Sequence, residues 1–599
     1  MAQGILLLGS LIRKIKKEVH IMKIRVFLKN GIQSMYAAIQ RFPITILMTS
    51  LTSFLLIYLV HEGSSMNSST LEYYQRITMT LALGIPLSLC IKRITEMKSS
   101  QSPWLFYLGG LLLLGAYYLF LLKDVEMLTG IRYAAVSIAL YLGFIFLPYF
   151  SADSHDFELY TLRLGGRFFL TGIYTIVLFL GLAGIFFTID RLLGISIKGE
   201  IYMDLWIASV GIFAPAFFLA AIPQGPLSKI SFSFPQAFQV LLLYIVMPLL
   251  TAYTVILYLF FAKILVNQEW PQGLVAHLVL WYSIITTVVF FFIDSIRSKN
   301  KWAQTFYFWL SKLIVPILII MFVSIGIRIN EYGITSNRYF VVLTGLWVTG
   351  SILYLGFFKK PKTVWLLASL SILAFLSVFG PWSHENLSFV SQANRLEKLL
   401  IKNELLQENV IIPSSTVPKE DQIAISEQIS YLNRIHGLDR LSYFPASFTT
   451  GQMDQVLGFS YQYPDYSYGR EYFSYMSNRD EVRLIPTKDY DYFLDFGNNY
   501  ASTQYSLEDI KVLYDSQTRE ISLEKNGQLL YHDFLSKFGE ELYEKYGSNH
   551  QQLSREDLMF VEENENVKIT FIFFNVEGEK RDDTVQLNYF NFYALIKIK

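Results

Sequence analysis

The sequence predicts an α-helical transmembrane bundle of about eleven spans, followed by a soluble α+β domain. Hydrophobic residues make up 53% of the 599-residue chain and charged residues only 17%, whereas soluble domains average about 25% charged residues. Residues 1–383 carry 29 Lys or Arg and 15 Asp or Glu, and residues 384–599 carry 21 and 34. Because the basic part is also the apolar part, its charges are expected to flank membrane spans, which argues against a nucleic-acid-binding protein.

Eleven apolar runs account for the bundle, which is predicted over residues 42–383. A helix that crosses about 30 Å of hydrocarbon needs roughly 20 mostly apolar residues, and its backbone polar groups must pair within the helix. The runs at 72–91 and 313–328 have the shortest apolar cores. The predicted spans are 42–60, 72–91, 103–122, 131–150, 168–189, 205–223, 238–261, 274–293, 313–328, 339–358 and 363–381.

Basic residues in the loops predict the orientation of the bundle, because Lys and Arg concentrate in cytoplasmic loops. The N-terminus and every second loop after it carry 21 basic residues, whereas the remaining loops carry eight. The N-terminus is therefore predicted to lie inside. An odd number of spans then places residues 384–599 outside.

Residues 1–41 are predicted to be a basic cytoplasmic segment and not a signal peptide. The apolar stretch at 5–12 is only eight residues long, and it precedes the basic run that begins at Arg13 instead of following it. One interpretation is an amphipathic segment on the inner leaflet. The other is that translation starts at Met22 and not at Met1.

Residues 384–599 are predicted to form an extracytoplasmic α+β domain that is large enough for its own core. Apolar positions at helical spacing predict helices over 388–410 and from Pro418 to Gly437. Asn526-Gly527 between two apolar strands predicts a hairpin. The remaining predicted elements are a helix and the two strands of a final hairpin: 534–546, 567–575 and 585–598.

Several segments resemble a known family. Residues 245–250 (IVMPLL) are similar to one of its spans, and residues 269–273 (EWPQG) are similar to the loop that follows. Residues 380–382 (GPW), followed by a helix that contains 395–396 (RL), resemble its exit from the last span. The family is a group of multi-span bacterial membrane proteins classed as a domain of unknown function, the DUF4153-type family. The resemblance implies a location in the bacterial cytoplasmic membrane and brings no catalytic residues.

His277 is the one ionisable side chain that the sequence places well inside a predicted span. It is either a proton or ligand site or, as we favour, a histidine hydrogen-bonded between helices, because no span contains an acidic partner. The lack of buried carboxylates argues against a transporter coupled to protons or sodium, and it is compatible with a groove that handles lipids. Prolines inside spans indicate kinks or exposed backbone, and a small-residue stripe predicts close helix packing. These residues are Pro86, Pro215, Pro248 and Pro316, and Ala135, Ala139 and Gly143.

A tyrosine-rich segment of the C-terminal domain is the predicted ligand-binding site. Tyrosine combines an apolar face with a polar tip, and it therefore suits stacking on sugars or contact with a protein. The alternative is that these tyrosines form a core and a surface that rests at the membrane interface. The candidate ligand-binding residues are Tyr461, Tyr463, Tyr466, Tyr468, Arg470 and Tyr472.

Acidic residues allow two further interpretations. Asp489, Asp491 and Asp495 resemble a metal-binding row, but they lack calcium-loop spacing, and a solvated strand face explains them without a metal. Glu62 and Glu72 in the first outer loop would serve a membrane-embedded transferase, an analogy of architecture alone. The sequence contains no phosphate loop, zinc spacing or serine elbow, so we expect no metal and no cofactor.

The sequence thus predicts a multi-pass protein of the bacterial cytoplasmic membrane without revealing a reaction. The first hypothesis is a non-enzymatic envelope protein that binds, senses or scaffolds, with the lipid bilayer and an envelope glycan, lipid or protein as partners. The second is a transporter or flippase of a lipid-soluble substrate. The third is a transferase that uses a lipid-linked donor, so enzymatic activity stays undecided and its absence is favoured.

Overall fold

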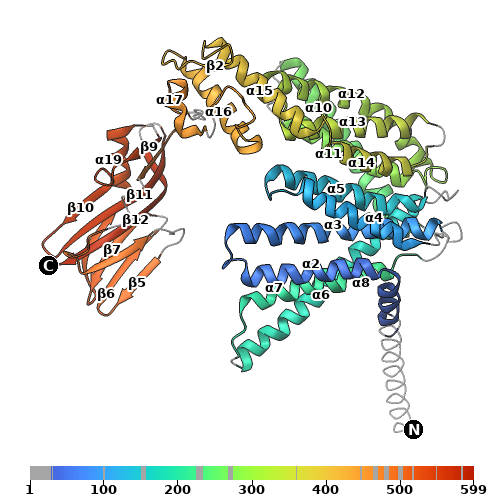
Figure 1. The fold of residues 1–599 in the computed structure, drawn as a ribbon, viewed down its shortest axis with the longest axis horizontal. Helices are drawn as coiled ribbons and strands as arrows, with labels where there is room; N and C mark the ends of the chain where they lie inside the picture. Colours follow the sequence, from blue (N-terminus) through green and yellow to red (C-terminus); the bar gives the residue numbers. More distant parts are fainter. Residues whose placement is uncertain are drawn as a thin grey trace, which may run out of the picture. The chain divides into compact units, whose positions relative to one another are not determined.

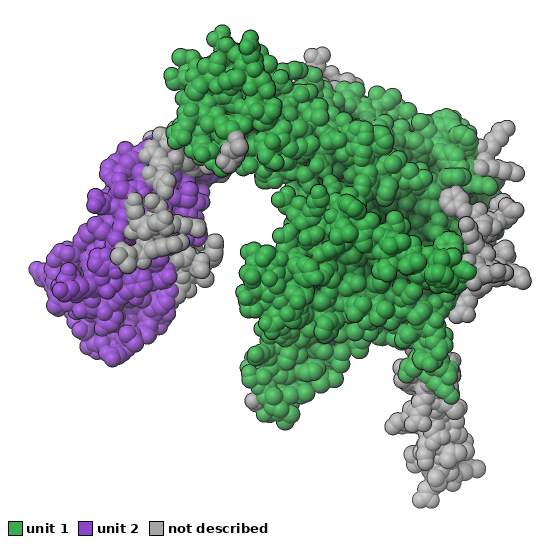
Figure 2. Space-filling model, in the orientation of Figure 1, with its two compact units in different colours: residues 1–461 green, residues 462–599 purple. Residues whose placement is uncertain are grey.

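The computed structural model divides the chain into two compact units, which Figure 2 shows in different colours. The helical unit comprises residues 1–461 and the β unit comprises residues 462–599. Each unit is described by itself. The described residues are 29, 31–98, 102–149, 157–193, 195–223, 234–267, 274–358, 361–445, 448–462, 470–477, 485–496, 503–515, 518–547, 550–581 and 584–599.

Ten helices of the described chain are long and apolar enough to cross a membrane, which confirms a multi-pass bundle (Figure 1). Both runs with short apolar cores, 72–91 and 313–328, belong to long helices. The helical elements are α2 (Pro43–Glu62), α3 (Ser68–Lys98), α4 (Pro103–Ala116) with η1 (Tyr117–Leu121), α5 (Met127–Phe146) with η2 (Leu147–Tyr149), α6 (Phe157–Leu193), α7 (Gly199–Ala208) with η3 (Ser209–Phe213) and α8 (Ala214–Ala220), α9 (Gln236–Val240) with η5 (Leu241–Val246) and α10 (Met247–Asn267), α11 (Leu274–Ile293), α12 (Lys301–Tyr332), α13 (Ser336–Phe357) and α14 (Val364–Leu376).

The eleventh predicted span, 363–381, contains the short helix α14, which has only 13 residues and is not among the ten. The apolar run continues beyond the helix, but its backbone leaves the helical path. Gly380 has a φ of +82°, and Pro381 follows it. A glycine in the left-handed region and a proline are ordinary signals that end a helix.

None of the four prolines inside the spans breaks its helix, and two of them follow wider turns. Proline cannot donate a backbone hydrogen bond to the carbonyl four residues earlier. Pro215 and Pro248 lie just after the π-helical segments η3 and η5, in which the turn is wide enough to absorb this loss. Pro86 and Pro316 lie inside the continuous helices α3 and α12.

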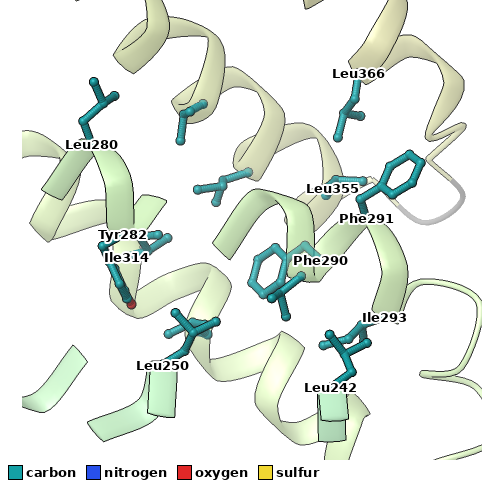
Figure 3. Packing of buried hydrophobic residues seen from close by; sticks show 14 of the residues in the cluster. Leu242, Leu250, Leu280, Tyr282, Phe290, Phe291, Ile293, Ile314, Leu355 and Leu366 are labelled. Atoms are coloured by element: carbon teal, nitrogen blue, oxygen red, sulfur yellow. The ribbon is translucent and has the colours of Figure 1, made fainter. Parts of the chain in front are cut away.

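The core of the bundle centres on α11 and α12. The side chains of Phe290, Ile314 and Leu355 are fully buried there, and Figure 3 shows them converging from three helices. The ring of Phe290 lies 4.5 Å from that of Tyr307, measured between centroids. α11 is the most buried of the ten long helices and α6 is the least buried.

The small-residue stripe of α5 packs against two neighbouring helices. The carbonyl of Ala139 accepts a 2.7 Å hydrogen bond from the Ser371 hydroxyl of α14. A Cβ atom added at Gly143 would lie 3.4 Å from the Cys90 sulfur of α3. Both contacts support the structural interpretation of the stripe.

Residues 384–461 fold as part of the helical unit. The two predicted helices are α15 (His384–Lys402) and α16 (Lys419–His436), and the second ends at Gly437, whose φ is +75°. The prediction of one helix over 388–410 is wrong after Lys402, because a small hairpin follows the helix there. Its strands are β1 (Leu406–Gln407) and β2 (Val410–Ile411).

The β unit combines two sheets with one helix, which confirms the α+β prediction. The larger sheet has the order β4-β12-β11-β3-β9, with β10 also paired to β11, and the smaller has the order β5-β6-β7-β8. Asn526 and Gly527 form the predicted turn, between β7 and β8. The elements are β3 (Arg470–Ser477), β4 (Tyr492–Phe496), β5 (Thr503–Leu507), β6 (Ile510–Tyr514), β7 (Glu520–Lys525), β8 (Gln528–Phe534), α19 (Ser536–Tyr546), β9 (His550–Leu553), β10 (Met559–Glu563), β11 (Val567–Arg581) and β12 (Thr584–Ile598).

One aromatic core joins both sheets of the β unit. The ring of Phe496 on β4 stacks on that of Phe592 on β12, with centroids 4.6 Å apart. Tyr514 of the smaller sheet meets the Phe496 ring edge-on. The larger sheet therefore has one face in this core, and its other face carries a second, smaller apolar cluster around Ile572 and Leu595.

Candidate functional site

Hydrogen bonds sort the helix ends of the bundle into two faces, and the first face collects every second end. Arg41, just before α2, forms a 2.8 Å ion pair with Glu96 near the end of α3, and it donates to the carbonyl of Ile222 beyond α8. Arg93 of α3 donates a 3.0 Å hydrogen bond to the hydroxyl of Tyr160 in α6.

The opposite helix ends form the second face. Arg132, near the start of α5, donates to the carbonyl of Leu121 at 3.3 Å and pairs with Glu385 of α15 at 2.8 Å. Between α12 and α13, the backbone N–H of Ile334 donates to the hydroxyl of Ser391 at 2.8 Å. α15 therefore lies on the second face.

The short helix α14 connects the two faces. Thr363, directly before it, donates a hydrogen bond to the carboxylate of Glu158 on the first face. Beyond its other end, the carbonyl of Trp382 accepts a 3.0 Å hydrogen bond from the hydroxyl of Tyr339 on the second face. Residues 363–383 thus traverse the same layer as the long helices.

A buried polar junction fixes α15 to the α12–α13 turn. Gln392 is 1% exposed, and its amide donates to the carbonyls of Tyr332 and Ile334 at 3.1 and 2.9 Å. Gly333 has a φ of +70°, and a Cβ atom there would lie 2.7 Å from the Gln392 amide nitrogen. This turn therefore requires glycine on both conformational and steric grounds.

Two histidines are buried in the junction. Nδ1 of His384 lies 3.2 Å from the hydroxyl of Ser336, and Nε2 of His436 lies 3.1 Å from that of Ser388. Burial lowers the pKa of His384 to about 4 and also lowers the pKa of His436, so both are neutral at pH 7. Because Ser388 is fully buried, its pairing with His436 cannot present a nucleophile to a substrate.

Sequence reasoning missed the junction, although α15 contains a signal for it. Its buried positions recur every four residues, as on one face of a helix. These positions are His384, Ser388, Gln392, Leu396 and Leu400. The first three of these buried positions are polar and the last two are apolar. Buried polar side chains on one helix indicate contact with polar backbone, here that of the α12–α13 turn.

The structure separates the predicted tyrosine site between the two units. Tyr461 is the last residue of the helical unit and packs on the core of its α15–α16 region. Tyr472 is half-exposed on β3 of the β unit, and the strand begins at Arg470. Tyr463, Tyr466 and Tyr468 lie outside the described residues, so a single site made of these six residues stays a prediction.

A polar row crosses the face of the larger sheet that lies opposite the aromatic core. It consists of Ser474, Asn575, Glu577, Tyr589 and Asn591, which strand pairing places side by side, with Tyr472 at its end. The amide of Asn575 donates to Glu577 at 2.9 Å. The side-chain oxygens of Asn575 and Asn591 are buried and have no hydrogen-bond partner among the described residues. Unpaired buried amide oxygens are costly.

The other predicted residues lie apart from one another. His277 is half-buried in the first turn of α11, near the second face. His61, in the last turn of α2, pairs with Asp204 at 2.8 Å and with Glu200 at 3.2 Å. The described chain contains no group of three or more residues placed to hold a metal ion.

Two apolar grooves lie between helices of the bundle. The larger, of about 920 Å³, is bounded by α3, α4, α5 and α14, and only Cys90 and Ser371 bring side-chain polar atoms to its wall. The smaller, of about 530 Å³, lies between α10 and α12 and includes Trp302 and Trp309. Such walls suit acyl chains and not polar substrates.

A match to a known protein family shows which family the chain belongs to. Residues 56–410 match the family described as Domain of unknown function (DUF4153). The chain belongs to this family. An uncharacterized protein of Pasteurella multocida, PM1469, is 28% identical over 196 residues, which span 33% of this chain and 33% of that protein. No solved structure matches the chain.

The DUF4153 match extends from α2 to β2 and therefore includes α14 and α15. His384, Ser388 and Gln392 of the junction lie within it, together with the α12–α13 turn. The β unit and its polar row lie beyond it. The family region thus contains both a membrane bundle and the helix on its second face.

Proposed function

We propose that this DUF4153 protein crosses the bacterial cytoplasmic membrane eleven times and presents residues 384–599 outside, where the β unit binds an envelope ligand. The observation that carries the orientation is the sorting of helix ends into two faces. The loops of the first face carry 21 basic residues and those of the second carry eight, so the first face is assigned to the cytoplasm.

The crossing of α14 supports the outer location of the C-terminal region. A 13-residue helix spans only about 20 Å, less than the hydrocarbon core. Its flanking residues supply the remaining length, because Thr363 is bound at the first face and Trp382 at the second. Trp382 is also exposed, as expected of a side chain at the membrane interface.

The polar row favours a glycan among the candidate ligands. Sugars offer hydroxyl groups to amides and carboxylates, and their C–H faces stack on aromatic rings. Asn575, Asn591 and Glu577 supply the polar groups, and Tyr472 and Tyr589 supply rings on the same sheet face. This assignment retains the ligand class proposed for the tyrosine segment and moves its centre from that segment to the sheet.

Reporter fusions test the orientation. We expect alkaline phosphatase to be active when it is fused after Ser383 or after Lys599, and inactive when it is fused after Lys362. A green fluorescent protein should give the reverse pattern. If the fusion after Lys599 is fluorescent, α14 does not cross, and an envelope ligand for the β unit is refuted.

A lipid-handling bundle is the second candidate function, because the 920 Å³ groove is apolar and open at its side. Reconstituted protein would then move a labelled lipid between leaflets without dependence on pH or sodium. A transferase is less favoured, since His61 pairs with Asp204 and Glu200 and not with Glu62 or Glu72.

A further inference from the structure

Three arginines gather around one tyrosine on the second face of the bundle. Arg328 lies in the last turns of α12, Arg338 in the first turn of α13 and Arg395 in α15. The guanidinium carbons of Arg338 and Arg395 lie 5.4 and 5.9 Å from the ring centroid of Tyr332. Arg328 lies four residues before Tyr332 in α12, and the two side chains therefore share one face of that helix. We call these three residues the arginine cluster.

The hydrogen bonds of the cluster use few of its donors. Arg338 donates through Nη1 to the carbonyls of Tyr332 and Gly333, and Arg395 donates through Nη1 to the carbonyl of Glu331. Each guanidinium has five N–H donors. Nε of Arg395 is buried and has no acceptor among the described residues.

Capping of α12 explains only part of this arrangement. Cations are favoured near the C-terminal carbonyls of a helix, which accounts for Arg338 and Arg395. Arg328 makes no hydrogen bond to a described residue, yet it adds a third positive charge at the same place. None of the three forms a salt bridge within the described chain, although the acidic residue Glu331 lies next to Tyr332 in the sequence.

We propose that the arginine cluster binds a phosphate group. Guanidinium forks match the oxygens of a phosphate in pairs, and three of them offset its charge while relieving their mutual repulsion. The cluster lies at the same end of the bundle as Tyr339 and the exposed Trp382, which are typical interface residues. The phosphate therefore belongs either to a lipid headgroup at this level or to a free phosphate.

The test uses the full-length protein in a non-ionic detergent. Dioctanoyl phosphatidylglycerol, inorganic phosphate and dioctanoylglycerol are titrated separately, and binding is followed by the rise in melting temperature and by native mass spectrometry. We expect the phospholipid to bind and dioctanoylglycerol to have no effect. Arg328→Gln should weaken phospholipid binding about tenfold, as expected for one charge-assisted interaction, and Arg328→Lys should weaken it less.

The choice of Arg328 keeps folding separate from binding, because the substitution breaks no hydrogen bond between this side chain and a described residue. Arg191→Gln, at the end of α6 on the same face, is the matched control and should bind normally. If inorganic phosphate binds as well as the phospholipid and Arg328→Gln weakens both, the source is free phosphate. If neither phosphate compound binds, or if both glutamine variants lose binding equally, the proposal is wrong. The result does not depend on which face is outside.

Discussion

The junction is a buried set of polar side chains and the polar row is largely half-buried, and the two differ in whether their amide groups are hydrogen-bonded. In the junction, Gln392 places both amide hydrogens on backbone carbonyls, although Nδ1 of His436 has no partner among the described residues. In the row, the amide oxygens of Asn575 and Asn591 have no partner among the described residues. Amide groups whose partners are in place fix one element on another, whereas unpaired amide oxygens make no such contact. The two regions therefore have different functions despite their similar composition.

Gln392→Leu should produce the largest loss of stability. The substitution leaves the carbonyl of Ile334 buried without a donor and removes one of the two donors to Tyr332. A buried unpaired carbonyl costs about 1–3 kcal/mol, so we expect the helical unit to lose about 2 kcal/mol in thermal unfolding in detergent. Asn394→Leu, on the exposed side of the same helix, should change stability by less than about 0.5 kcal/mol. Equal losses would show that the junction is not a completed network.

Acid should weaken the junction next. The unfolded chain has ordinary histidines with a pKa near 6.5, whereas the pKa of folded His384 is about 4. The stabilisation is thus complete above pH 6.5 and decreases as the pH falls toward 4, by at most about 1.4 kcal/mol per pH unit for one proton. His436, with a lowered pKa of its own, adds to the loss in the same direction.

Melting temperatures of the full-length protein between pH 4 and pH 7.5 check this dependence. His384→Gln should flatten the profile, because the variant no longer takes up that proton on unfolding. The charges near His384 are Glu385, Arg132 and His436, and only Glu385 favours its protonation. His532→Gln, at an exposed position of the β unit, should leave the profile unchanged. A wild-type profile that is flat below pH 6.5 would contradict the buried, neutral state of His384.

The spans could be predicted because the bilayer imposes a simple rule on each helix alone. A long apolar run has to be helical in lipid, whatever its neighbours are. The rule overestimates the length of α14. The apolar run continues, but the helix ends before Ser377, Gly380 and Pro381. The hairpin at Asn526-Gly527 was predictable for a similar reason, because two residues determine the turn locally.

The contacts of α15 with the bundle could not be predicted, because they join residues that are distant in sequence. Arg132 and Glu385 are separated by 253 positions, and neither carries a local sign of its partner. The polar row depends on the pairing of three strands, including a register shift between Phe573 and Asn575. Of the polar row, the tyrosine prediction identified only the end residue, Tyr472. Composition gives residue types and not the sheet face on which the residues lie.

Asn591→Leu gives the smallest expected change in stability and separates the two regions most clearly. Asn591 is 9% exposed, and its side-chain oxygen has no partner, so leucine removes an unpaired polar atom and keeps a similar volume. We expect the free energy of unfolding to change by less than about 1 kcal/mol, in either direction. Binding of the full-length protein to purified cell-wall glycan should nevertheless be lost, as measured by co-sedimentation. Asn588→Leu, on β12 outside the row, should keep both stability and binding. If Asn591→Leu destabilises the protein as much as Gln392→Leu does, the row is a completed structural network like the junction, and the β unit needs another surface for its ligand.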